Sequence, residues 1–114
     1  MAKGEHLGDL EQVVMLAVVR LSERAYGMTV RQEIEVNTGR QASLGAIYAT
    51  LDRLEEKGLV SSTSGNGTPE RRGRAKRFFK VQARGVRALQ DALADLDRMR
   101  RGIEGLDGPL GAET

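Results

Sequence analysis

The chain has 114 residues, of which 39% are hydrophobic and 30% are charged, with a formal net charge of +2. This composition is typical of a single globular domain with a modest core, and it excludes a disordered chain. The absence of cysteine excludes a disulfide framework, and no apolar run approaches the ~18 residues of a membrane span, so we expect no membrane partner.

The net charge conceals a strongly basic segment between residues 69 and 87. Eight bases oppose a single acid there, Glu70, which gives the segment a charge of +7 and leaves −5 for the rest of the chain. A local excess of this size attracts a polyanion at short range. The bases are Arg71, Arg72, Arg74, Lys76, Arg77, Lys80, Arg84 and Arg87.

The first predicted helix spans residues 9–22 and follows residues 1–8, which we expect to form a flexible arm. The arm lacks the apolar stretch of a signal peptide, so a cytoplasmic protein is expected. Asp9 and Gln12 resemble a capping box for the first free amides of the helix. The helix is apolar on two opposite sides, which indicates burial on both, the second against another subunit. The first side consists of Leu10, Val13, Val14, Ala17, Val18 and Leu21, and the second of Met15, Leu16 and Val19.

Two short helices are predicted next. The first spans residues 27–38 and is followed by Gly39 as its C′ residue, where glycine readily adopts a left-handed conformation. The second begins at Ser43, a good N-cap, and stops at Gly58. We expect the core to receive Met28, Val30 and Ile34 from the first helix and Leu44, Ile47, Leu51 and Leu54 from the second.

A β-hairpin follows these helices. Residues 59–63 read as one strand and residues 74–81 as the return strand, with a long polar loop rich in turn formers between them. Alternation in the return strand puts two apolar side chains, Phe79 and Val81, on one face. The opposite face carries Lys76, Phe78 and Lys80.

The last predicted helix covers residues 83–104 and precedes residues 105–114, which we expect to be a disordered tail. Its apolar residues fall at the a and d positions of a heptad, with Arg100 interrupting at an a position. Such a seam is usually part of a chain's own core. Here the helices and the hairpin already supply a core, so we expect the seam to contact a second copy of the chain. The seam consists of Val86, Leu89, Leu93, Leu96 and Ile103.

The order of these elements predicts the fold class. Three short helices, a hairpin and a last helix indicate a mainly α chain with a small β-hairpin, in which a winged helix-turn-helix precedes a C-terminal dimerisation helix. The two domains would then be residues 9–82 and residues 83–104.

No catalytic set is present in the sequence. The single histidine, His6, lies in the N-terminal arm, and the acidic residues are scattered over helix surfaces without the spacing of metal ligands. Residues 65–67, Gly-Asn-Gly, lack the following helix and the Lys-Ser/Thr ending of a phosphate loop. We therefore expect no enzyme, no metal ion and no cofactor.

The third predicted helix has a small, uncharged leading end around one large polar aromatic, Tyr48, and its charges begin only at Asp52. A helix that enters the major groove of DNA needs such an end, and its first amides favour anions. Tyr48 also lies beside the apolar stripe, so the alternative role for it is a half-buried residue at the edge of the core. The predicted DNA-binding residues of this helix are Ser43, Gly45, Ala46, Tyr48 and Ala49.

The basic segment falls on the tip and return strand of the predicted wing. A run of charge is usually a solvated face, but here almost no acid is interleaved, and a wing beside a recognition helix meets phosphates. The predicted wing contacts are Arg71, Arg72, Arg74 and Lys76. We therefore predict a homodimeric, sequence-specific regulator of double-stranded DNA with residues 43–57 in the major groove. The alternative is a winged-helix module for protein–protein contact, although a wing of that kind would carry apolar or mixed charge.

Four stretches resemble the PadR family of bacterial transcriptional regulators, over roughly residues 7–90: LGDLEQVVMLAVV, AYGMTV, LGAIYATLDRLEEKGLV and RAKRFFKVQARG. The third is the most specific, because it combines a G-x-I-Y pattern, an L-x-R-L-E run and a closing G-L-V. The resemblance implies a winged-helix homodimer, usually a repressor, whose C-terminal helices contact the partner's N-terminal helix. It places the family's recognition-helix tyrosine at Tyr48 and its basic wing at Arg71, Arg72, Arg74 and Lys76.

The sequence departs from the family pattern at several positions. Many members have proline where Ala49 stands, and tyrosines followed by threonine where this chain has Phe78, Phe79 and Gln82. The single C-terminal helix is typical of the short type. Some relatives bind flat aromatic compounds between tryptophans at the dimer interface. This chain has no tryptophan, so no effector site is carried over, and the effector, the operator and the regulated genes stay open.

Overall fold

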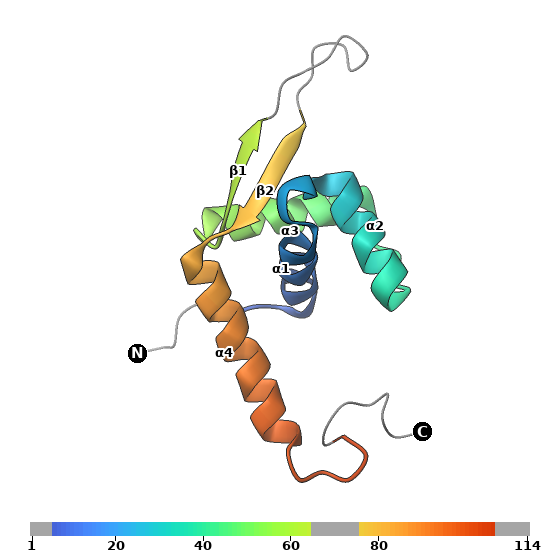
Figure 1. The fold of residues 1–114 in the computed structure, drawn as a ribbon, viewed down its shortest axis with the longest axis vertical. Coiled ribbons are helices and arrows are strands. Elements are labelled where there is room, and N and C mark those ends of the chain that lie inside the picture. The colour runs from blue at the N-terminus through green and yellow to red at the C-terminus, as the bar shows by residue number, and fades with distance from the viewer. Residues whose placement is uncertain (1–5, 65–75, 107–114) are drawn as a thin grey trace.

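The computed structural model describes residues 6–64 and 76–106, which form four α-helices and a two-stranded antiparallel sheet (Figure 1). This architecture confirms the predicted fold class, a mainly α winged helix followed by a C-terminal helix. No helix in these two ranges is long and apolar enough to span a bilayer. The elements are α1 Asp9–Leu21, the 3-10 helix η1 Ser22–Arg24, α2 Gly27–Thr38, α3 Leu44–Glu56, β1 Val60–Ser64, β2 Arg77–Val81 and α4 Ala83–Arg100.

Helix α1 forms the centre of the core and packs against α2, α3, β2 and α4. Both predicted apolar sides of α1 are present. The first is largely buried, but the residues of the second differ in burial. Met15 is fully buried (0% exposed), and its Sδ-methyl end lies against Gly85 of α4. Leu16 and Val19 are 39% and 53% exposed. Met15 therefore lies in the chain's own core, unlike its two predicted companions on the dimer surface.

The start of α1 differs from the predicted capping box by one residue. Gly8 is the N-cap, and Asp9 is already helical. The carboxylate that reaches back belongs to Glu11, whose Oε1 accepts the backbone N–H of Gly8 at 2.8 Å. Gln12 instead donates to the carbonyl of Leu7 at 3.2 Å. Leu7, placed by the sequence in the N-terminal arm, is buried in the core.

The helix-turn-helix pair α2–α3 buries the stripes that the sequence predicts, with two exceptions. Val30, Ile34, Ile47, Leu51 and Leu54 are buried. Met28 is 37% exposed, because the inward stripe of α2 follows the four-residue spacing of Val30 and Ile34 and Met28 lies off it. Leu44 is only half-buried, since it opens the helix. Gly39 ends α2 with φ +77°, which confirms its predicted left-handed conformation.

The hairpin pairs Val60 with Val81 and Ser64 with Arg77. Phe79 faces the core and is 3% exposed, whereas Phe78 lies on the other face, as the alternation predicts. A third segment joins this small sheet: the Phe79 amide donates to the carbonyl of Ala25 at 2.8 Å, and Phe78 forms an isolated bridge with Tyr26. The hairpin is the predicted wing, and its base, which we call the wing root, is thereby bonded to the segment that begins α2.

Helix α4 starts at Ala83, as predicted, and leaves the body of the domain on the side opposite to the hairpin (Figure 1). Gly85 sets its closest approach, because a Cβ there would lie 2.2 Å from the carbonyl oxygen of Leu59. Leu89 is 6% exposed and packs in the chain's own core, whereas Leu93 is 41% exposed. The helix ends at Arg100 and not at residue 104, so Ile103 lies beyond the end of the helix.

Candidate nucleic-acid interface

The leading end of α3 is open and uncharged. Ser43 caps it, since its Oγ accepts the backbone N–H of Ala46 at 3.0 Å. Gly45 and Ala49 are exposed and four residues apart, so they share one face of the helix. The first charged residue of the helix is Asp52. A face of this kind can approach another surface closely without steric or electrostatic cost.

Tyr48 stands beside this face at the junction of α3 and α2. The residue is half-buried and packs against the core. A Cβ on Gly27 would lie 2.3 Å from the Cζ of Tyr48 and 2.5 Å from its hydroxyl oxygen. The end of the ring therefore lies over the first residue of α2, which only glycine allows. This position agrees with both roles considered from the sequence, a core-edge residue and a contact residue.

The wing root carries an aromatic and cationic stack that the sequence did not predict. The rings of Tyr26 and Phe78 meet edge to face, with 5.4 Å between their centroids. The Nζ of Lys76 lies 4.1 Å from the centroid of the Tyr26 ring. Such a contact both orients the ammonium group and leaves it charged. Tyr26 had no distinguishing signal in the sequence beyond its place before Gly27.

Of the four predicted wing residues, Lys76 alone lies within the described ranges. Arg71, Arg72 and Arg74 lie outside them. Lys76 is held on Tyr26, on the same side of the molecule as the start of α2, and its neighbour Arg77 points to the other face of the strand.

Arg77 joins the wing to the second half of α3. Its Nη2 lies 2.6 Å from Oε1 of Glu55 and 2.9 Å from Oδ1 of Asp52. Ser62 of β1 donates its hydroxyl to the other oxygen of Glu55 at 2.8 Å. The Ser62 hydroxyl and the Arg77 guanidinium hold the pKa of Glu55 below its usual value. Two of the three acids that follow the open end of α3 are thus paired with a cation of the wing.

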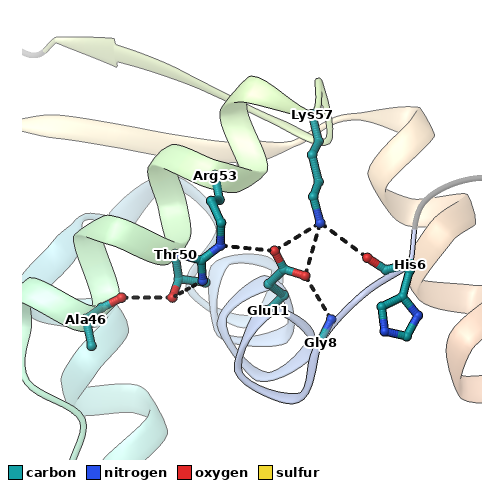
Figure 2. Close-up of polar contacts among 7 residues, drawn as sticks. All are labelled: His6, Gly8, Glu11, Ala46, Thr50, Arg53 and Lys57. Carbon is teal, nitrogen blue, oxygen red and sulfur yellow. Dashed lines mark hydrogen bonds and ion pairs between the residues drawn. The ribbon is translucent and has the colours of Figure 1, made fainter.

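A second acid–base cluster fixes the far end of α3 to the start of α1 (Figure 2). Glu11 is 6% exposed and accepts hydrogen bonds from Lys57 at 3.1 and 3.2 Å. Its Oε2 also lies 3.5 Å from Nε of Arg53. Burial raises the pKa of Glu11, but the hydrogen bonds from the Gly8 amide and from Lys57 outweigh burial and hold the pKa below the ordinary value. This cluster orients α3 through Arg53 and Lys57, which follow its uncharged leading end in the chain.

Comparison with known proteins identifies the family. A family model for PadR-like transcriptional regulators matches residues 15–91. The chain belongs to this family. It is therefore a DNA-binding transcriptional regulator and not an enzyme. No relative was found among curated proteins.

Solved structures share the PadR-like fold. A PadR family transcriptional regulator from Eggerthella lenta is 25% identical, with 79% of this chain and 78% of that chain covered and a TM-score of 0.63. A transcriptional regulator from Clostridium thermocellum is 14% identical, with 80% and 85% covered and a TM-score of 0.68. A PadR family regulator from Clostridium difficile is also 14% identical, with 80% and 91% covered and a TM-score of 0.63. The last two comparisons establish the fold alone.

This PadR-like chain leaves an apolar surface uncovered on α1 and α4, which we call the α1–α4 face: Leu16, Val19, Val86, Leu93 and Leu96. Their exposed fractions range from 39% for Leu16 to 57% for Leu96. A groove of about 700 Å³ adjoins this face and is lined in part by Val19, Val86 and Phe78. Met15 and Leu89, which the sequence placed on the same seam, are instead buried within the chain, and Ile103 is 47% exposed beyond the end of the helix.

Among the residues in 6–64 and 76–106, no cluster of acids and histidine is placed to hold a metal ion.

Proposed function

We propose that this PadR-like regulator is a cytoplasmic repressor that binds a double-stranded DNA operator as a homodimer, with α3 in the major groove. One observation carries the proposal: the open end of α3 is small, uncharged and capped by Ser43. Tyr48 beside it lies over Gly27, the neighbour in the chain of Tyr26, whose ring holds Lys76 of the wing root. The major groove admits a helix whose leading face is free of bulk and negative charge.

The proposed contacts divide into two sets. Residues on the leading end of α3 approach base edges and the nearest phosphates, and the basic residues of the wing neutralise the backbone. The wing supplies affinity that depends on salt, because each neutralised phosphate releases counterions. The first set is Ser43, Gly45, Ala46, Tyr48 and Ala49, and the second is Arg71, Arg72, Arg74 and Lys76.

The proposed dimer contact is the α1–α4 face. Exposed leucine and valine side chains lie on both of these helices, and contact with a second copy would remove them from water. A two-fold dimer places two copies of α3 on one side of the DNA, so it reads two half-sites about one helical turn, ~34 Å, apart. A protein bound across such an operator excludes the transcription machinery, which is how a repressor acts.

The experiment that tests this proposal is selection of DNA by the purified chain. We expect the chain to enrich fragments of its own genome, and duplexes from a random library, that share one inverted repeat. The spacing of the repeat should equal one or more helical turns. Enrichment of no sequence, with weak binding that is equal for all duplexes, would contradict the proposal and favour a protein-binding role for the winged helix.

A further inference from the structure

Arg77 contacts two elements at once. Its guanidinium bonds to Glu55 and Asp52 of α3, its Nε donates to the hydroxyl of Ser62 in β1 at 3.3 Å, and its Cζ lies 4.9 Å from the centroid of the Phe79 ring. The side chain is 38% exposed, so it is neither a core residue nor a freely solvated one. Arginine suits this position because its planar group donates in several directions at once.

The two acids that Arg77 holds lie at the edge of the proposed DNA-reading face. Asp52 follows Ala49 by three residues, and Ala49 follows Gly45 by four, so the three share one stripe of α3. Asp52 is 57% exposed, and Glu55 stands one turn further toward the wing with 35% of its side chain exposed. Without a cation beside them, both carboxylates would repel the phosphates of a duplex bound to this face.

Stability alone does not account for this arrangement. Partly exposed ion pairs contribute little to folding, because water screens them and ordering the side chains costs entropy. The DNA-binding face, in contrast, gains directly from the cancellation of negative charge, since binding to phosphates depends on the local potential.

We propose that Arg77 is a positioning residue for DNA binding: it holds Asp52 and Glu55 of the recognition helix against the wing and offsets their charge, so that the face of α3 can approach a phosphate backbone. This inference rests on the proposed function. Arg77 acts through the two acids and does not itself contact the DNA.

The test compares variants on the duplex that the wild-type chain selects from a random library. Arg77→Gln should lower affinity for that duplex by about tenfold, because like charges then face each other across the interface. Addition of Asp52→Asn and Glu55→Gln to Arg77→Gln should restore affinity to near the wild-type value, since neither of the two acids that Arg77 pairs with is then charged. Arg98→Gln is the matched control, because Arg98 pairs with Asp95 on α4, away from α3, and it should leave affinity unchanged.

Two further measurements keep the outcomes apart. Thermal unfolding of each variant should change little, and Arg77→Lys, which keeps the charge, should retain most of the affinity. If the acid substitutions fail to restore binding, the inference is overturned. If, in addition, the salt dependence of affinity of Arg77→Gln falls by about one phosphate contact per copy, Arg77 is a phosphate ligand instead. If the wild-type chain selects no duplex, the proposed function fails and this inference fails with it.

Discussion

Tyr48 occupies the junction at which α3, the start of α2 and the core meet. Its ring is packed, and its hydroxyl end lies over Gly27. The ring and the hydroxyl can therefore serve separate purposes, packing and recognition, and a substitution that removes only the oxygen distinguishes them.

Tyr48→Phe should leave the free energy of unfolding almost unchanged and lower operator affinity by about 1–2 kcal/mol, the scale of a hydrogen bond to a charged group. Tyr48→Ala is the control for packing and should destabilise folding by about 3 kcal/mol, as truncation of a buried aromatic does. Equilibrium unfolding and titration of the selected duplex measure the two quantities. Normal affinity for Tyr48→Phe would leave Tyr48 with a packing role only.

Glu11 provides a prediction about pH. Its folded-state pKa is depressed, so its contribution to stability is complete above the ordinary value of 4.5 and is lost as pH falls through the folded-state pKa. Glu11→Gln should therefore be less stable than the wild type by about 1–2 kcal/mol at neutral pH, where charged hydrogen bonds are lost. The difference should shrink in acid. A difference in unfolding free energy that stays constant from neutral pH to pH ~3 would show that the Glu11 charge is not what stabilises the contact.

At the scale of residues, the sequence predicts burial and helix caps but not the side-chain pairs between distant segments. The half-burial of Tyr48 follows from its place beside the Ile47–Leu51 stripe, and the caps Ser43 and Gly39 follow from local chemistry. Pairs such as Glu11 with Lys57 do not, because the partners are 46 residues apart and meet only through the packing of α1 on α3. The same reason hides the contact of Tyr26 with Lys76.

At the scale of elements, close backbone approach determines how α4 joins the domain. Gly85 is the residue at which α4 crosses the strand ends, and its absent side chain is what allows the contact with Leu59 and Met15. The sequence predicts the start of α4 correctly but not this crossing, because a glycine in a heptad pattern carries no signal of what lies against it. It also overestimates the length of α4, since the heptad continues in register to Ile103 while the helix ends at Arg100.

Gly85→Ala should destabilise the chain by about 2–3 kcal/mol, because the added methyl would overlap the backbone of Leu59 and the core must shift. Gly45→Ala is the matched control: it lies in a helix with only the Ser43 Oγ near the added atom, at 4.0 Å. That control should be neutral or more stable by up to ~1 kcal/mol, the helix preference of alanine over glycine. Equal unfolding free energies for the two variants would contradict the close approach of α4.

At the scale of the whole molecule, the proposed DNA-binding dimer rests on two surfaces, the exposed α1–α4 face and the open end of α3. The sequence predicts that α1 and α4 carry surplus apolar residues. It cannot divide them between the chain's own core and a partner, because the apolar side of α1 that holds Met15 also holds Leu16, and the seam of α4 that holds Leu89 also holds Leu93. Only the folded chain separates the buried member of each pair from the exposed one.

Leu93→Asp should convert the proposed dimer to a monomer or unfold it, because a charge would be buried in the proposed contact and folding would be linked to assembly. Val36→Asp is the matched control, since Val36 is 82% exposed on α2 and outside the α1–α4 face; it should remain dimeric. Sedimentation equilibrium and far-UV circular dichroism measure mass and helix content. A wild-type chain that sediments as a stable monomer would remove the dimer from the account.

The central claim is that the leading end of α3 meets the DNA, and a charge placed on that end tests it most directly. Ala49→Glu keeps a helix-forming residue at an exposed position, so the fold and the dimer should be unchanged, while a carboxylate is set against phosphates and base edges. We predict that affinity for the selected duplex falls by about 100-fold or more, an effect of several kcal/mol from like charges at an interface, and that Val36→Glu binds as the wild type does. Wild-type affinity for a folded, dimeric Ala49→Glu would contradict the account.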